Sequence, residues 1–138
     1  MANSVNTQVL LDGPRNCVLK VEGILDTSDL SSQVLIDPAT LAGMDFSGTQ
    51  KALGLIVERI QFSIEDTLEV RLAWDATTPQ RMVELQGRAT EKYERFGGLI
   101  NNSGAGRTGK ILISTQGWAA SAVLSFTLIL TMKKQGSL

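Results

Sequence analysis

Hydrophobic and polar residues alternate along residues 121–133, the longest pattern of this kind in the chain. One parity holds only apolar residues: Ala122, Leu124, Phe126, Leu128, Leu130 and Met132. The other parity holds mostly Ser, Thr and Lys residues. A period of two over this length is typical of a β-strand with one buried face and one solvated face. We therefore predict a strand at residues 121–133.

Shorter alternating segments recur along the rest of the chain. They predict strands at residues 7–11, 17–25, 33–36, 56–64, 68–74, 82–87 and 110–115. Gly23 interrupts the second of these segments, which indicates a β-bulge. The tight hinge at Glu65 and Asp66 predicts that the segments on either side of it pair as a hairpin. Residues 90–96 have the composition of a short helix, and Gly97 would end it.

About eight short strands, with turns roughly every ten residues, favour an antiparallel β-sandwich over a parallel α/β fold. The long connections 38–52 and 88–109 suit jelly-roll crossings better than a meander. We therefore expect an all-β sandwich of the jelly-roll type, with at most one short helix, as a single domain at residues 7–134. Residues 1–6 are expected to form a flexible arm and residues 135–138 a tail. The predicted core contains Ile60, Phe62, Ile64, Leu68, Val70, Leu72, Leu124, Phe126, Leu128 and Leu130.

The composition is ordinary for a globular domain and provides few groups for catalysis. The 138 residues carry 13 Lys and Arg against 14 Asp and Glu, so the charge gives no broad footprint for nucleic acid. Histidine is absent and Cys17 is the single cysteine, which removes the usual catalytic base, an internal disulfide and a His-based or Cys-based metal site. Neither a secretory signal nor a membrane-spanning run is recognisable. We expect synthesis in the cytosol and no membrane partner.

The sequence GAGRTGK at residues 104–110 matches the first part of a phosphate-binding loop. That motif also requires a Ser or Thr after the Lys, and a helix whose N-terminus faces the phosphate. Ile111 occupies the Ser/Thr position, and the residues after it alternate like a strand. We therefore interpret the segment as a loop between strands, and expect no bound nucleotide, other cofactor or metal.

Two features are candidates for binding another protein. Residues 88–110 carry five basic residues, which form either a solvated face or a docking patch for an acidic protein surface: Arg88, Lys92, Arg95, Arg107 and Lys110. Trp118 follows Gly117 in a corner and belongs either to the core or to an interface. Trp74 ends an apolar parity and is expected in the core.

Several turn and corner sequences together carry a family resemblance. They are NTQVLLDGPRN at 6–16, GILDTSDL at 23–30, IED at 64–66, WDAT at 74–77, KYERFGG at 92–98, GAG at 104–106, TGKI at 108–111 and STQGW at 114–118. This set resembles the capsid cement (decoration) proteins of short-tailed bacteriophages, over about residues 6–134. The resemblance implies a jelly roll on the outer surface of an assembled virion.

In this family role the protein would assemble in the host cytoplasm, act as a homodimer and bridge neighbouring copies of the major capsid protein. The resemblance assigns no individual contact residue. Candidates for capsid or dimer contacts therefore come from the polar arm, the basic segment and the Trp corner: Ala2, Asn3, Val5, Asn6, Arg95, Arg107, Lys110 and Trp118.

Two other classes of function stay open on the sequence. A jelly-roll module of a phage tail or fibre that binds carbohydrate or another ligand would need aromatic residues clustered at one loop end. The chain has two Trp, one Tyr and four Phe, most of them on core parities. An enzyme would have to use the Gly-rich loop at residues 104–110 for a nucleotide. We expect a protein that is not an enzyme.

Overall fold

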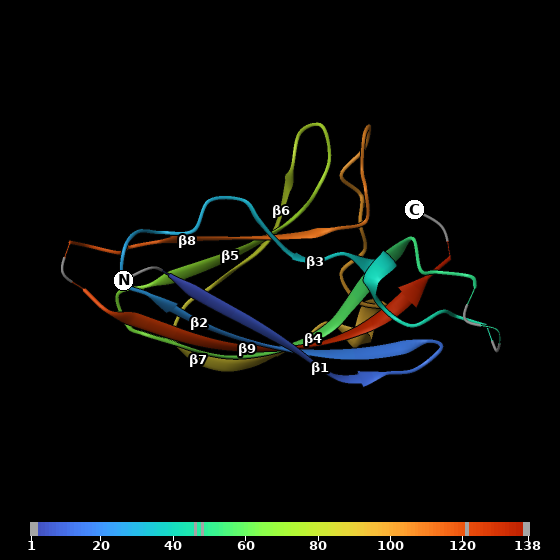
Figure 1. Ribbon diagram of the computed structural model, residues 1–138, viewed down its shortest axis with the longest axis horizontal. Coiled ribbons are helices and arrows are strands. Elements are labelled where there is room, and N and C mark those ends of the chain that lie inside the picture. The colour runs from blue at the N-terminus through green and yellow to red at the C-terminus, as the bar shows by residue number, and fades with distance from the viewer. Residues whose placement is uncertain (1–2, 46, 48, 121, 137–138) are drawn as a thin grey trace.

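The computed structural model describes residues 3–45, 47, 49–120 and 122–136, which form two antiparallel β-sheets stacked as layers (Figure 1). Nine strands lie within the described residues. One sheet contains β1 (Ser4–Asp12), β2 (Asn16–Leu25), β4 (Gly54–Ile64), β7 (Arg88–Lys92) and β9 (Leu124–Gln135), and the other contains β3 (Gln33–Ile36), β5 (Glu69–Trp74), β6 (Gln80–Leu85) and β8 (Ile111–Gln116). Two short 3₁₀ turns, η1 (Pro38–Thr40) and η2 (Glu94–Phe96), lie in the connections.

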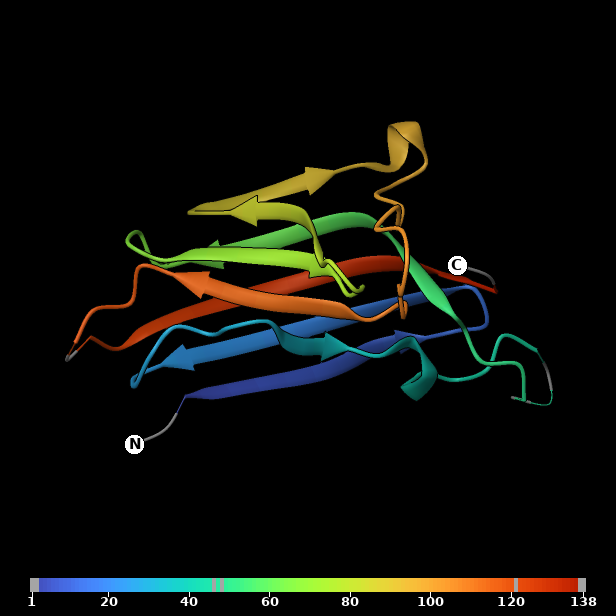
Figure 2. The same ribbon diagram turned by 90° about the horizontal axis from the view of Figure 1, so that it is seen from above.

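The order of the strands is that of a jelly roll. The sheets run β1-β2-β9-β4-β7 and β3-β8-β5-β6. Four antiparallel pairs are nested in the sequence: β5 with β6, β4 with β7, β3 with β8 and β2 with β9. Successive pairs alternate between the two sheets, which is the arrangement of a jelly roll. The predicted jelly-roll sandwich is confirmed, and Figure 2 shows β1 and β7 at its opposite margins.

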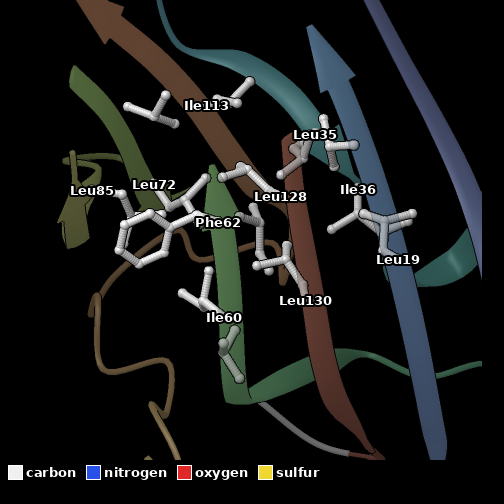
Figure 3. Packing of buried hydrophobic residues seen from close by; sticks show 14 of the residues in the cluster. Leu19, Leu35, Ile36, Ile60, Phe62, Leu72, Leu85, Ile113, Leu128 and Leu130 are labelled. Atoms are coloured by element: carbon white, nitrogen blue, oxygen red, sulfur yellow. The ribbon is translucent and has the colours of Figure 1, made fainter. Parts of the chain in front are cut away.

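The core lies between the facing sides of the two sheets. Figure 3 shows side chains from β4 and β9, among them Ile60 and Leu128, packed with Leu72 of β5 and Ile113 of β8. Nine of the ten predicted core residues are at most 7% exposed: Ile60, Phe62, Ile64, Leu68, Val70, Leu72, Phe126, Leu128 and Leu130. The tenth, Leu124, is half-buried and packs against this cluster. Trp74 is also buried, as expected.

The predicted hairpin between residues 56–64 and 68–74 is wrong. β4 and β5 lie in different sheets, and the turn at Glu65, whose carbonyl accepts a 3.0 Å hydrogen bond from the Leu68 N–H, carries the chain from one layer to the other. Strands that face each other across a core bury alternate residues, as paired strands with one buried face do. The alternation of residues therefore could not distinguish a hairpin within one sheet from two strands in facing sheets.

Gly23 does not form the predicted bulge. β2 and β9 pair without a register shift from Asn16 to Leu25, and Phe126 lies directly opposite Gly23. A Cβ atom built on Gly23 would lie 2.2 Å from Cζ of Phe126. The glycine therefore provides space for the aromatic ring. The register of this sheet shifts instead in β1, between Val9 and Leu11.

The predicted helix at residues 90–96 is wrong as well. Residues up to Lys92 belong to β7, where Lys92 pairs with Arg59 of β4. Only Glu94–Phe96 forms a 3₁₀ turn, which ends at Gly97 with a φ of 91°. Pairing with an existing sheet edge outweighs the weak helical propensity of so short a segment.

The polar arm predicted at residues 1–6 is strand from Ser4 onward, so this part of the prediction is wrong. Residues 4–6 pair with residues 22–24 of β2, and Ala2 lies outside the described residues. The β-ladder satisfies backbone groups that a loose arm would leave to water. At the other end of the chain, β9 continues to Gln135, beyond the predicted boundary of the domain.

Candidate functional site

An apolar hollow of about 320 Å³ lies at the end of the sandwich that carries the β5–β6 and β7–β8 connections. Its lining residues come from β5, β6, η2 and the segment that follows η2: Trp74, Arg81, Met82, Phe96, Gly98, Leu99, Ile100 and Asn102. Phe96 is 69% exposed and Ile100 is 56% exposed. Exposed apolar side chains beside a hollow are a feature of surfaces that bind another molecule.

The backbone around the hollow is fixed by hydrogen bonds to β4. Val57 and Leu99 exchange two backbone bonds, of 3.1 and 2.8 Å, and the Tyr93 N–H donates to the Glu58 carbonyl at 2.8 Å. Gly98 has a φ of 93° and packs against Ile56, where a Cβ atom would lie 2.5 Å from Ile56 Cγ2. These contacts form the hollow before any partner binds.

The walls of the hollow combine one exposed aromatic ring with a few polar groups. Phe96 packs edge-on against Tyr93, with ring centroids 6.3 Å apart. Trp74 is only 2% exposed and forms part of the floor. Arg81 forms an ion pair with Glu84. The hollow can therefore accept an apolar side chain, with the guanidinium of Arg81 beside it.

The second candidate is the edge surface, defined as residues 4–11 of β1. β1 pairs with β2 and forms one margin of the five-stranded sheet. Val9, Leu10 and Leu11 are between 45% and 52% exposed, and residues 4–11 contain no Asp, Glu, Lys or Arg. Edge strands are usually protected by charged side chains, and β7 at the opposite margin carries Arg88, Glu91 and Lys92. The edge surface lacks that protection.

The arm residues predicted to make contacts have different surroundings, and Asn3 lies just before the edge surface. Asn3 binds its own chain, because its Oδ1 accepts hydrogen bonds of 3.0 Å from the N–H groups of Asp26 and Thr27. Val5 is half-buried and packs against the core. Asn6 is exposed and pairs in register with Glu22 of β2.

The basic residues of 88–110 do not form one patch. Arg88 lines a polar hollow with Glu65 and Asp66, at the end of the sandwich where β4 passes into β5. Arg107 lies at the other end, where its Nη1 donates to the carbonyl of Asn101 at 3.1 Å. Lys110 is half-buried beside the connection that leaves β5, and Arg95 is exposed on η2. The candidate contacts Arg95, Arg107 and Lys110 thus share one end of the molecule with the apolar hollow.

Trp118 occupies a structural corner. Its indole N–H donates to the Ala122 carbonyl at 3.0 Å, and its backbone N–H donates to Asp29 Oδ1 at 3.1 Å. The side chain is half-buried and packs against the core. Of the two interpretations of Trp118, these contacts favour a place in the core.

The Gly-rich segment is a loop between strands, as predicted, and Ile111 begins β8. The Gly-rich loop contacts the connection after β5. Thr108 donates from Oγ1 to Asp75 Oδ2 at 2.7 Å and from its N–H to the Asp75 carbonyl at 3.1 Å. The Thr77 N–H donates to the Ala105 carbonyl at 3.2 Å. The helix that a phosphate-binding loop requires does not follow.

A buried ion pair lies at the end of the sandwich that also carries the Gly-rich loop. Lys134, whose side chain is fully buried, donates from Nζ to Asp12 Oδ1 at 2.5 Å and to the Ala42 carbonyl at 2.8 Å. Burial alone would raise the pKa of Asp12, but the hydrogen bonds from Lys134 and Ala42 and the nearby Lys charges outweigh it and lower that pKa. Burial also raises the pKa of the Cys17 thiol to about 11, so this thiol is a structural group.

Sequence reasoning missed the residues that define the apolar hollow and the ion pair. Lys134 shares the parity of Met132, which is a signal that the lysine points inward. Phe96 and Ile100 follow no strand periodicity, so nothing in the pattern separates them from core residues.

Within residues 3–45, 47, 49–120 and 122–136, no three Asp, Glu or Cys side chains gather into a possible metal site. In the same residues no helix is long and apolar enough to cross a membrane. Comparisons with known protein families, curated protein sequences and solved structures find no match to this chain.

Proposed function

We propose that the protein is a structural virion protein that binds the outside of an assembled bacteriophage capsid and stabilises it by bridging neighbouring major capsid proteins. One observation carries this proposal: a single sandwich presents two separate surfaces, the apolar hollow and the uncharged edge surface. The hollow is lined from β6 and η2, and Figure 2 shows β1 at the opposite margin from these elements. A bridging protein needs two contact surfaces held apart on a rigid body, because each must engage a different neighbour.

The fold and the family resemblance support the same proposal. Jelly rolls are common among viral capsid proteins, although they also occur in lectins and enzymes. A fold alone does not define a function. The turn and corner sequences resemble those of capsid cement proteins, and two separate surfaces suit the contacts that such a protein would make.

A cement protein acts by mass action. It binds the assembled lattice and not the separate subunits, so its binding free energy adds to the stability of the shell. Each contact need contribute only a few kcal/mol, because the shell repeats it many times and bridging makes each site multivalent.

The apolar hollow is the proposed contact for the major capsid protein. Phe96 and Ile100 project beside it, and aromatic side chains at the centre of an interface often dominate binding. In the bound state we expect an apolar side chain of the capsid protein to occupy the hollow. Arg95 and Arg107 at the same end would meet acidic groups at its rim.

The experiment uses phage heads assembled without this protein and measures co-sedimentation with purified protein added back. Wild-type protein should bind assembled heads and not free capsid protein, and should raise the temperature at which the heads rupture. Phe96→Ala should weaken binding by about 2 kcal/mol, or roughly thirtyfold. Val123→Ala is the matched control, because Val123 is 66% exposed in the β8–β9 connection. Failure of the wild-type protein to bind intact heads would refute the proposal.

A second candidate function also rests on the apolar hollow. The exposed ring of Phe96 lies near Arg81 and Asn102, and an aromatic face with adjacent hydrogen-bonding groups can bind a sugar. A ligand-binding module of a phage tail or fibre would then be the function. Binding of a glycan from an array, abolished by Phe96→Ala, together with no binding to heads, would favour this candidate.

A further inference from the structure

A polar groove lies on the outer face of the five-stranded sheet, which is the lower layer in Figure 1. We infer that this groove binds a neutral oligosaccharide. The polar residues that define the groove are Gln61, Ser63, Glu65, Asp66, Arg88 and Thr127. It reaches the end of the sandwich opposite the apolar hollow, so the inference stands or fails independently of capsid binding and of a sugar in that hollow.

The polar groove joins two hollows that share Ser63 and Thr127. The larger hollow, of about 180 Å³, extends to Arg88 and to the turn after β4. The smaller hollow, of about 90 Å³, extends to Gln61 and Ile129. Ser63 pairs with Thr127 of β9 and with Arg88 of β7. The groove therefore crosses three neighbouring strands, with one apolar side chain, Ile129, beside its polar groups.

Ser63 and Thr127 point away from the core. Their neighbours Phe62 and Leu128 are paired with each other and buried between the sheets, and successive residues of a strand point to opposite faces. Ser63 is exposed and Thr127 is half-buried. A ligand can therefore reach both hydroxyl groups from solvent.

The fold leaves the polar side chains of this groove available to a ligand. Among the described residues, the side chains of Gln61, Ser63, Thr127 and Arg88 have no hydrogen-bond partner. The outer face of the four-stranded sheet differs, because its charged side chains are joined in ion pairs. Placed donors and acceptors without partners are what fixes a polar ligand in a site.

Opposite charges face the larger hollow without pairing. Glu65 and Asp66, in the turn after β4, and Arg88, at the start of β7, all line it. None of the three forms an ion pair within the part of the chain that the structure describes. A hydroxyl group both donates and accepts hydrogen bonds. Neighbouring hydroxyls of a sugar ring can thus donate to a carboxylate and accept from the guanidinium, and such charge-assisted bonds are the stronger ones.

The surroundings of the groove favour an uncharged ligand with several rings. Thr127 pairs with Glu22 of β2, and Glu22 pairs with Asn6 of β1, so the same row of side chains continues to a third hollow of about 80 Å³. Lys20 and Glu22 form an ion pair of 2.8 Å there. Because the row carries both signs of charge, it does not select a strongly charged ligand. Five strands spaced about 4.8 Å apart span roughly 19 Å, which gives room for an oligosaccharide.

The first test measures binding of neutral glycans to the intact protein. A glycan array should show binding to neutral linear glycans in preference to sialylated or sulfated ones, and calorimetric titration with cellohexaose, maltohexaose and isomaltohexaose should give a dissociation constant for at least one of them. Arg88→Ala should raise that constant roughly tenfold, the effect of losing a hydrogen bond to a charged group. Arg95→Ala is the matched control and should bind like the wild type, because Arg95 is exposed on η2 at the other end of the molecule.

The second test fills the groove. Ser63→Met places a longer side chain where the two hollows meet and should abolish binding. Thr131→Met is the control on the same face, because Thr131 pairs with Arg59 and lines neither hollow. Phe96→Ala, in the apolar hollow, should also leave binding unchanged. Circular dichroism checks that each variant is folded, and Arg88→Ala provides a second variant of the groove.

Four results would each overturn the inference. They are no binding to any neutral glycan, binding only to sialylated or sulfated glycans, binding of free glycine or lysine in place of a glycan, and glycan binding that Phe96→Ala abolishes while Ser63→Met and Arg88→Ala leave it intact.

Discussion

At the scale of single residues, the packing of Phe126 depends on the absence of a side chain at Gly23. Phe126 is 2% exposed, so its ring has little room to move in a close-packed interior. Gly23→Ala is expected to lower the free energy of unfolding by about 1–3 kcal/mol, because the added methyl group overpacks the site. Urea unfolding followed by tryptophan fluorescence measures this change.

Gly13→Ala is the matched control for this prediction. A Cβ atom at Gly13 would meet only the Asn16 carbonyl oxygen at 3.6 Å, which is an ordinary contact. The double variant Gly23→Ala/Phe126→Leu should lose less stability than the sum of its two single variants, because the smaller side chain vacates the space. Strictly additive losses would show that Gly23 and Phe126 are not coupled.

The ion pair of Lys134 and Asp12 predicts a dependence of stability on pH. Asp12→Asn leaves the buried ammonium group of Lys134 without its counter-charge. Breaking a fully buried pair costs roughly 3–5 kcal/mol. The side chain of Asp12 is 28% exposed, so we expect a smaller loss of about 2–3 kcal/mol at pH 7. Glu22→Gln, in the more exposed pair with Lys20, should change stability little.

The sign of the pH effect follows from the lowered pKa of Asp12. The stabilisation by the carboxylate is fully present above its ordinary value of 3.8, and is lost as the pH falls through the lower pKa of the folded protein. The difference in unfolding free energy between wild type and Asp12→Asn should therefore shrink as the pH falls below 3.8. A difference that stays constant down to pH values well below this would contradict the role of the ion pair.

Whether a residue is buried was predictable where the alternation of apolar and polar residues alone determines its burial. Period-two alternation identified the core residues of β4, β5 and β9, because burial on one face is what produces the pattern. Lys134 obeys the parity of its strand but not the rule that lysine is exposed. Its position depends on Asp12, more than a hundred residues away, which no local pattern can indicate.

At the scale of elements, the loop at residues 104–110 is held against the connection after β5. Gly106 has a φ of 77°, and a Cβ atom there would lie 2.0 Å from Thr77 Oγ1. Gly106→Ala should therefore separate the loop from Thr77. Hydrogen exchange should show lost protection of the Thr77 and Thr108 amides, which donate across this contact.

Gly104→Ala separates the effect of contact from that of backbone strain. Gly104 has a φ of 87°, and nothing lies within 4 Å of its built Cβ atom. Both substitutions place a side chain in the left-handed region, at a cost of roughly 1–2 kcal/mol, but only Gly106→Ala adds the collision. Equal loss of amide protection in both variants would show that backbone strain alone displaces the loop.

The type of an element, strand or loop, was predictable more often than the strand with which it pairs. Residues 90–92 belong to the segment of helical composition at 90–96, but they lie where β4 offers an unpaired edge, and pairing determined their structure. The turn at Glu65 joins two strands in both the predicted and the observed arrangement. Whether those strands pair or face each other depends on β7 and β9, which occupy both sides of β4.

At the scale of the whole molecule, the number of strands and the length of the connections were enough to predict a jelly roll. The chain crosses from one sheet to the other through the long connections at residues 37–53 and 93–110, and also through the short ones at residues 65–68 and 86–87. The apolar hollow was not predictable in the same way. It combines β5, β6, η2 and the segment that follows η2, and such a combination exists only once the nested pairs have formed.

The place of β9 in the five-stranded sheet has a consequence for synthesis. Leu124–Gln135 lies between β2 and β4, although both of those strands precede it in the chain. Ribosomes add about 5–20 residues per second, so β2 and β4 wait roughly 6–22 s and roughly 4–14 s, respectively, before the strand that joins them has been made. During that interval the nascent chain exposes two apolar strands without their shared neighbour. Unpaired apolar strands favour aggregation, and the sandwich closes only after translation has passed Gln135.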